Sequence, residues 1–141
     1  MDFNQLSEFV TNHPILFMAL LATLAMLVGS ELRLRMSKVK QIVPAEATRR
    51  LNHEDAIMVD MRTDKDYRDG HIVNAVHVPP ETAADKLQKY RDRSLIVYCH
   101  NGKQSSQLAG KLSKQGFENV SNLKGGILSW QQANLPLSRG K

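Results

Sequence analysis

From residue 41 to residue 136 the chain alternates short apolar runs with segments of helical character, and this alternation limits the possible folds more than any other feature. Strands that alternate with helices predict a parallel sheet covered on both faces. The most apolar run, Leu95–Tyr98, is expected to be the central strand. The expected strands are residues 41–43, 56–60, 75–78, 95–98 and 119–123. The expected helices are residues 44–51, 64–69, 82–89, 105–115 and 127–133.

The composition supports a folded domain and excludes several kinds of site. Hydrophobic residues make up 42% of the 141 residues and charged residues 23%, which is typical of a chain that can bury a core. The single cysteine excludes an internal disulfide, a zinc site built from several cysteines and a two-cysteine redox motif.

The N-terminal part of the chain differs sharply from the rest. Residues 9–30 contain no formally charged side chain, and an apolar stretch of about 20 residues is long enough to cross the hydrocarbon core of a bilayer. Pro14 suits the first turn of such a helix. The charge that precedes the stretch is acidic, whereas a signal peptide begins with basic residues. A buried soluble helix would be shorter or amphipathic. The pattern therefore favours a transmembrane helix over residues 9–30.

The charges that flank residues 9–30 predict an orientation. Asp2 and Glu8 give the first 30 residues a charge of −2, while all 19 basic residues and 12 acidic residues follow, giving +7. Basic residues next to a membrane span remain on the cytoplasmic side. We expect a single-pass protein of the cell (inner) membrane with its N-terminus outside and its main domain in the cytoplasm. The bilayer is then one partner, and a membrane protein is another possible partner.

These observations give the expected organisation of the chain. Residues 1–8 form a short extracytoplasmic segment, residues 9–30 the transmembrane helix and residues 31–40 a basic connector. Residues 41–138 form the α/β domain, and residues 139–141 form a tail. The basic excess has no accompanying aromatic motif, so no nucleic-acid partner is expected.

The lone cysteine occupies an informative position, because Cys99 directly follows the predicted central strand. Ligand sites of parallel sheets lie at the carboxyl ends of the strands. Backbone N–H groups of the loop and the start of the next helix would stabilise a thiolate there. Cys99 is therefore the candidate nucleophile, although a lone cysteine can also be a small buried apolar residue. The candidate substrate-binding residues are His100, Asn101, Gly102, Lys103, Gln104 and Ser105.

The loop sequence narrows the chemistry of Cys99. A phosphatase of the Cys-x5-Arg type needs an arginine six positions after the cysteine, and that position is Ser105. A self-contained disulfide oxidoreductase needs a second cysteine. A persulfide, Cys–S–S⁻, is a compact anion that suits a small ring of N–H donors.

Four motifs in order resemble the rhodanese family of sulfurtransferases. They are residues 59–62 (VDMR), residues 66–79 (DYRDGHIVNAVHVP), the loop 99–104 with Ser105, and residues 123–130 (LKGGILSW) followed by Leu135-Pro136. Two positions depart from the family pattern. Asn74 replaces a glycine and tolerates the left-handed backbone conformation. His100 replaces an arginine found in some members that use thiosulfate.

The resemblance implies a three-layer α/β/α fold with a five-stranded parallel sheet, and a sulfurtransferase that carries sulfane sulfur as a Cys99 persulfide. It gives supporting roles to three other residues. Asp60 and Arg62 would brace the strand end, and His71 would bond the backbone of its turn. No cofactor and no metal are expected.

The expected partners are a small sulfur donor and a thiophilic acceptor, which would be a thiol, cyanide or a protein. Two other functions remain open. One is a membrane-tethered binding or scaffold module, and the other is a thiol sensor in which Cys99 is oxidised.

Overall fold

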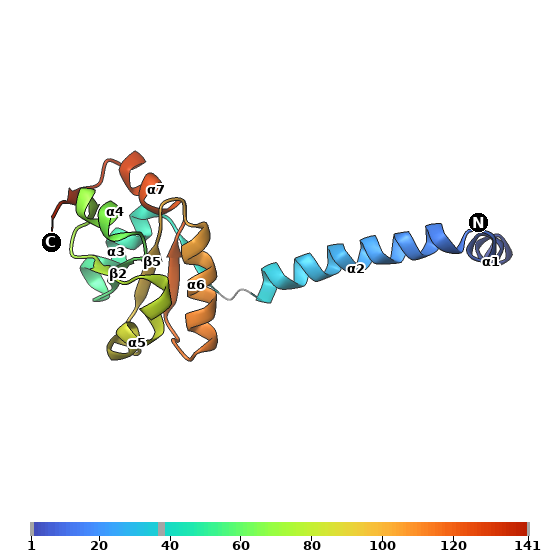
Figure 1. The fold of residues 1–141 in the computed structure, drawn as a ribbon, viewed down its shortest axis with the longest axis horizontal. Coiled ribbons are helices and arrows are strands. Elements are labelled where there is room, and N and C mark those ends of the chain that lie inside the picture. The colour runs from blue at the N-terminus through green and yellow to red at the C-terminus, as the bar shows by residue number, and fades with distance from the viewer. Residues whose placement is uncertain (1, 37–38, 141) are drawn as a thin grey trace. The chain divides into compact units, whose positions relative to one another are not determined.

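The computed structural model describes residues 2–36 and 39–140, and it divides the chain into two compact units, residues 1–37 and residues 38–141. The first unit contains two helices, α1 (Phe3–Asn12) and α2 (Pro14–Met36). Figure 1 shows both units, of which the second holds the sheet.

The predicted helix over residues 9–30 is wrong in its limits. The chain leaves the helical conformation at His13, whose N–H donates to the carbonyl of Phe9 at 3.0 Å, and Pro14 then begins α2 because it needs no N–H partner in a first turn. Helix α2 continues to Met36, well into the predicted connector, since residues 31–36 contain no Gly or Pro to stop it. Residues 37–38 of that connector lie outside the described residues.

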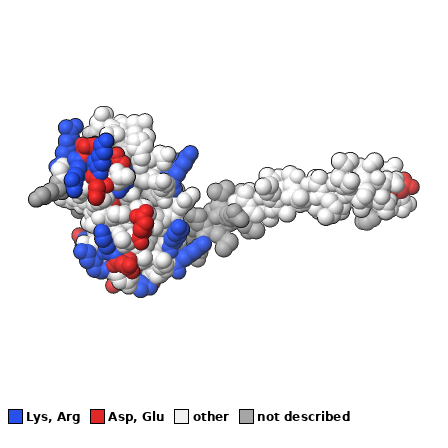
Figure 2. Space-filling view, viewed as in Figure 1, with Lys and Arg blue, Asp and Glu red and all other residues white. Residues whose placement is uncertain are grey.

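Most side chains of α2 over residues 15–28 are apolar and exposed. Ile15 and Met26, for example, are 82% and 80% exposed, and Figure 2 shows this helix almost without charged atoms. Among the residues that the structure describes, no helix combines the length and the apolar character that a membrane crossing requires. The predicted transmembrane helix therefore has no support from the structure.

The second unit is built on a five-stranded sheet in which every neighbouring pair of strands is parallel, as predicted. The spatial order is β1-β6-β5-β2-β4, so β5 is central. The five strands are β1 (Lys40–Ile42), β2 (Ile57–Asp60), β4 (Val76–His77), β5 (Leu95–Tyr98) and β6 (Val120–Leu123).

The strands are buried on both faces, because alternate side chains enter two separate cores. In β5, Leu95 and Val97 join one core, while Ile96 and Tyr98 join the other. The first core is covered by α5 (Ala83–Leu87) and α6 (Lys103–Lys114), and the second by α3 (Pro44–His53) and α7 (Gly126–Gln132). Figure 1 shows α6 lying beside the strands of the sheet. The result is the predicted three-layer α/β/α architecture.

Smaller elements complete the unit. They are α4 (Asp64–Asp69), the 3-10 turns η1 (Pro80–Thr82) and η2 (Gln88–Tyr90), and the strands β3 (His71–Ile72) and β7 (Leu137–Ser138). Strands β3 and β7 form an antiparallel pair that the sequence did not predict. This pair joins the C-terminal segment to the turn that follows α4. The C-terminal segment is also bound to α7, because Trp130 Nε1–H donates to the Pro136 carbonyl at 3.0 Å.

Candidate active site

Cys99 lies at the carboxyl end of the central strand, in the turn that joins β5 to α6. Its side chain is only 3% exposed. Gly102 precedes α6 with a φ of 85°, a left-handed conformation that favours glycine. A Cβ at this position would come within 3.0 Å of the Gly125 nitrogen and the Leu123 carbonyl oxygen, so Gly102 also allows the loop to lie against the next turn.

The Cys99 sulfur receives hydrogen bonds from the loop and from the first turn of α6. The Gly102 N–H donates to Sγ at 3.2 Å and the Ser105 N–H at 3.5 Å, and the Ser105 Oγ lies 3.3 Å from Sγ. Sequence reasoning expected donors from residues 100 to 105. In the structure the Lys103 N–H instead donates to Asn101 Oδ1 at 3.1 Å, which shapes the loop.

These contacts change the acidity of the thiol. Burial raises the pKa of Cys99, but hydrogen bonds from Ser105, Gly102 and Asn101 outweigh burial, so the pKa lies below its usual value. The site therefore favours the thiolate, which is the nucleophilic form of cysteine.

The start of α7 holds the backbone of the cysteine loop in place. The Ile127 N–H donates to the Cys99 carbonyl at 3.0 Å, and the Leu128 N–H to the His100 carbonyl at 3.4 Å. Gly126 has a φ of 61°, and a Cβ there would collide with the carbonyl oxygens of Cys99 and His100. The two carbonyls therefore point away from the sulfur toward α7, which leaves the N–H groups of the turn to face it.

Asn122, in the middle of β6, is a buried polar residue that sequence reasoning missed. Its Oδ1 lies 2.6 Å from Ser105 Oγ, and its Nδ2 donates to the Gly102 carbonyl at 3.0 Å and to Gln41 Oε1 at 2.7 Å. Both the loop and the serine beside the sulfur are thus tied to the sheet. The signal in the sequence is only an amide side chain inside the predicted strand over residues 119–123.

A second buried network supports the residue that precedes the cysteine. Asp60 is fully buried and forms an ion pair with Arg62 at 2.7 Å. Tyr98 donates its hydroxyl proton to Asp60 Oδ2 at 2.6 Å and accepts from the Ile72 N–H at 3.1 Å. Burial raises the pKa of Tyr98, and the nearby Asp60 carboxylate raises it further, so the phenol stays protonated.

His71 lies in the same region and takes part in local structure. Its Nδ1 contacts the Tyr67 carbonyl at 2.7 Å, which requires a proton on Nδ1, and its ring stacks on that of Tyr67 at 3.8 Å. Among the described residues, no group of three His, Cys, Asp or Glu side chains is placed to hold a metal ion.

The other predicted binding residues lie on the surface of the loop. The side chains of His100, Asn101, Lys103 and Gln104 are exposed. His100 also lines a hollow of about 350 Å³, together with Arg62, Gln131 and Arg139. Cys99 is not among the residues that line this hollow.

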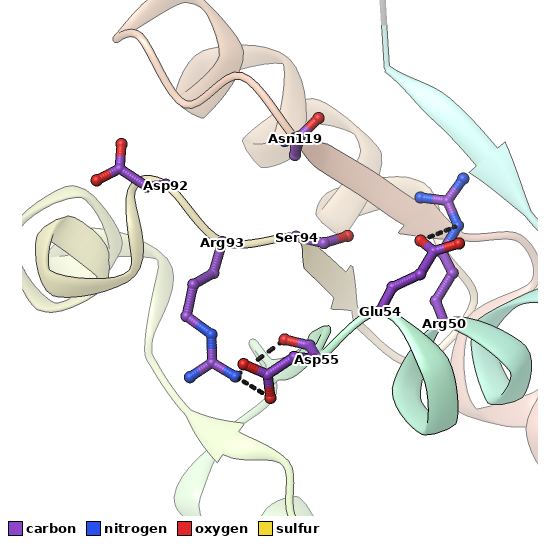
Figure 3. A pocket seen from close by; sticks show the side chains of 7 residues that line it. All are labelled: Arg50, Glu54, Asp55, Asp92, Arg93, Ser94 and Asn119. Atoms are coloured by element: carbon purple, nitrogen blue, oxygen red, sulfur yellow. Dashed lines mark hydrogen bonds and ion pairs between the residues drawn. The ribbon is translucent and has the colours of Figure 1, made fainter.

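A larger hollow of about 540 Å³ lies at the opposite edge of the sheet, where Ser94 and Asn119 precede their strands. Figure 3 shows two ion pairs among its charged side chains, Arg93 with Asp55 and Arg50 with Glu54. Cys99 is not among the residues that line it. This hollow is therefore separate from the cysteine loop, which lies at the carboxyl edge of the sheet.

The fold and the site together define an α/β/α domain in which a parallel sheet presents one cysteine to backbone N–H groups of Gly102 and Ser105. Residues 43–133 match the model of the Rhodanese-like domain, and the chain belongs to this family.

Several relatives share this domain. The Uncharacterized protein YibN of Escherichia coli (strain K12) is 40% identical over 97% of this chain and 99% of its own length. A protein of Allochromatium vinosum named Sulfurtransferase is 34% identical over 60% of this chain and 79% of its own. The tRNA uridine(34) hydroxylase of Cronobacter sakazakii is 30% identical over 61% of this chain, but over only 27% of its own length.

Solved structures agree with the fold. The Alr3790 protein from Anabaena sp. superposes with a TM-score of 0.65 at 30% identity, covering 70% of this chain and 82% of the other. Sequence and structure therefore agree on the family. The relatives described above are named for different activities.

Proposed function

We propose that the protein is a sulfurtransferase that carries sulfane sulfur on Cys99 as a persulfide. The observation that carries this proposal is the set of hydrogen bonds from Gly102 and Ser105 to a buried sulfur whose pKa is lowered. A thiolate held in this way is a ready nucleophile, and the same donors suit the persulfide anion.

The first half of the reaction loads the cysteine. The Cys99 thiolate attacks the outer sulfur of a donor such as thiosulfate, a new S–S bond forms, and the S–S bond of thiosulfate breaks. Sulfite leaves with the electron pair of the broken bond, and Cys99–S–S⁻ remains. The charges balance, since a thiolate and a dianion become a persulfide anion and a dianion.

The second half returns the cysteine to its starting state. A nucleophile, either cyanide or a thiolate, attacks the outer sulfur of the persulfide, and the Cys99 thiolate leaves. The product is thiocyanate or a new persulfide, and a protein thiol is an equally suitable acceptor. With one cysteine in the chain, the sulfur passes to another molecule.

The test is an adduct experiment with the full chain. The protein is incubated with thiosulfate and, separately, with a low-molecular-weight persulfide, and intact mass then shows whether one sulfur atom has been added. We expect the adduct on the wild type, its loss on addition of cyanide together with formation of thiocyanate, and neither in Cys99→Ser. Equal thiocyanate formation by wild type and Cys99→Ser, with every donor tried, would contradict the proposal.

We also propose that the N-terminal unit attaches the protein to the cell membrane. The support is the run of exposed apolar side chains on α2, from Ile15 to Val28, together with the absence of formal charge in residues 9–30. Such a surface is unfavourable in water and favourable in an apolar phase. Attachment would bring the sulfur carrier, or a scaffold module of the same fold, close to a membrane-bound partner.

Fractionation tests the attachment. Full-length protein should sediment with membranes and resist alkaline carbonate, whereas a variant that begins at residue 39 should stay in the soluble fraction. Recovery of the full-length protein in the soluble fraction would contradict this second proposal and leave the sulfurtransferase proposal untouched.

A further inference from the structure

The hollow of about 350 Å³ that borders His100 is lined by charged side chains of both signs. They are Arg62, Asp66, Asp69 and Arg139. Figure 2 shows basic and acidic side chains mixed on the surface where Figure 1 places α4 and the C-terminal segment. The volume lies at the lower end of the range of about 300–1,000 Å³ that is typical of small-molecule sites. The hollow is therefore of a size to hold a small charged molecule.

Arg62 gives this hollow a rigid hydrogen-bond donor. Its side chain is only 9% exposed, and its Nε and Nη2 donate to the Asp60 carboxylate while Nη2 also donates to the Gly70 carbonyl at 2.6 Å. Its Nη1 donates to none of the described residues. Arg93 Nε is the one fully buried side-chain nitrogen without a partner among them, so Nη1 of Arg62 is accessible. Two N–H groups of a fixed guanidinium are therefore available to an acceptor in the hollow.

Asp69 and Arg139 add two opposite charges that do not pair with each other. Both side chains are exposed, and neither forms an ion pair with any residue that the structure describes. A ligand with a single charge would meet only one of them. A ligand that carries a carboxylate and an ammonium group would meet both, so the charges of the hollow complement a zwitterion.

We propose that this hollow binds the carboxylate and the ammonium group of a small amino-acid thiol, such as free cysteine, which accepts the sulfur from Cys99. Arg62 and Arg139 bind the carboxylate, and Asp69 binds the ammonium group. This inference rests on the proposed sulfurtransferase function and names its acceptor class. The acceptor thiolate attacks the outer sulfur of the persulfide, the S–S bond to Cys99 breaks with its electron pair on Cys99, and the amino acid leaves as a persulfide anion.

Three thiols that differ in their charged groups test the assignment, with transfer measured from the sulfur-loaded full chain. Cysteine carries both groups, 3-mercaptopropionate lacks the ammonium group, and cysteamine lacks the carboxylate. Arg139→Gln should lower kcat/KM about fivefold for cysteine and 3-mercaptopropionate but not for cysteamine. Asp69→Asn should lower it about fivefold for cysteine and cysteamine but not for 3-mercaptopropionate.

Controls separate binding of the charged groups from general damage. Each thiol is compared with itself between variants, so differences in thiol pKa cancel, and the uncharged 2-mercaptoethanol should react equally with every variant. Lys86→Gln and Asp85→Asn remove matched charges from exposed positions of α5 that do not line the hollow. These two variants should leave the rates with all four thiols unchanged. Equal losses for all four thiols in Arg139→Gln and Asp69→Asn would overturn the assignment.

A binding measurement keeps this inference separate from the proposed function. S-methylcysteine carries both charged groups but has no thiol to accept sulfur. Titration calorimetry should detect its binding to the full wild-type chain, with about fivefold weaker affinity in Arg139→Gln and in Asp69→Asn. That pattern supports the zwitterion site even if no persulfide forms on Cys99. No binding to the wild type, or equal affinity in the wild type and both variants, would overturn the inference.

Discussion

The backbone N–H of Ile127 donates to the carbonyl oxygen of Cys99 at 3.0 Å, so the first turn of α7 sets the direction of the peptide group beside the nucleophile. This contact is possible because Gly126 lets the two segments approach closely. The glycine pair of the sequence 123–130 is thus part of the cysteine loop's support, although it lies more than twenty residues away along the chain.

Replacing Gly126 by alanine should destabilise the domain and displace the loop that contains Cys99. The new Cβ would meet the carbonyl oxygens of Cys99 and His100 at a φ of 61°, and we expect a loss of at least about 2 kcal/mol of unfolding free energy. Gly110→Ala is the matched control. Gly110 lies inside α6, and among the described residues only Val39 is near its Cβ position, so alanine should add about 0.5–1 kcal/mol to the free energy of unfolding. Urea unfolding measures the free energy of unfolding of both variants. Equal changes in the two variants would contradict the close approach of Gly126 to the cysteine loop.

The lowered pKa of Cys99 predicts the pH profile of its alkylation. Only the thiolate reacts, so the rate should rise about tenfold per pH unit below the pKa and level off above it. In the native protein the midpoint of this profile should lie below the usual thiol pKa of about 8.5, because hydrogen bonds from Ser105 and Gly102 outweigh the effect of burial. The urea-unfolded chain should show the usual value. Coincident native and unfolded profiles would show that the loop does not stabilise the thiolate.

The hydroxyl of Tyr98 should contribute to the stability of the domain. Tyr98→Phe leaves the buried Ile72 N–H without an acceptor and removes a donor from Asp60, which should cost about 1.5–3 kcal/mol of stability. Tyr90→Phe, in the half-buried turn η2, is the control and should change stability by less than about 0.5 kcal/mol. Denaturant titrations compare the two. A loss no larger for Tyr98 than for Tyr90 would exclude the network around Asp60 as a source of stability.

The sequence predicted the five-stranded sheet, most clearly through β2 and β5, which are local apolar runs. It did not predict strands β3 and β7, since each has two residues and is defined only by its partner far along the chain. It placed the start of α6 at Ser105, two residues late, because helix formation begins directly after the left-handed Gly102.

The candidate site was predicted only in part, because some of its residues form a local pattern and others meet only through the fold. Cys99 and its loop are contiguous in sequence, so strand, turn and helix patterns locate them. The contributions of Asn122 and Tyr98 depend on pairing between strands: β5 and β6 lie side by side, and Asn122 reaches the cysteine loop across that pair. No local pattern shows which buried polar side chain faces which loop.

The ion pair between Asp60 and Arg62 should be the most costly single interaction to break in this domain. The Asp60 carboxylate is fully buried and the Arg62 side chain is 9% exposed. In Asp60→Asn the buried guanidinium would keep its charge and lose its counter-ion, and breaking such a pair costs about 3–5 kcal/mol. The Tyr98 hydroxyl would also lose its charged acceptor.

Glu46→Gln is the control for this prediction. Hydrogen bonds from Arg49 and Arg50 lower the pKa of Glu46 to about 2. The side chains of Glu46 and Arg49 are 29% and 53% exposed, so solvent screens their interaction. We expect a far smaller loss of unfolding free energy in Glu46→Gln than in Asp60→Asn, measured by urea titration at neutral pH. Because Asp60 also orients the residue before Cys99, Asp60→Asn should in addition slow persulfide formation, whereas Glu46→Gln should not. Similar losses of stability in the two variants would contradict a bracing role for the buried pair.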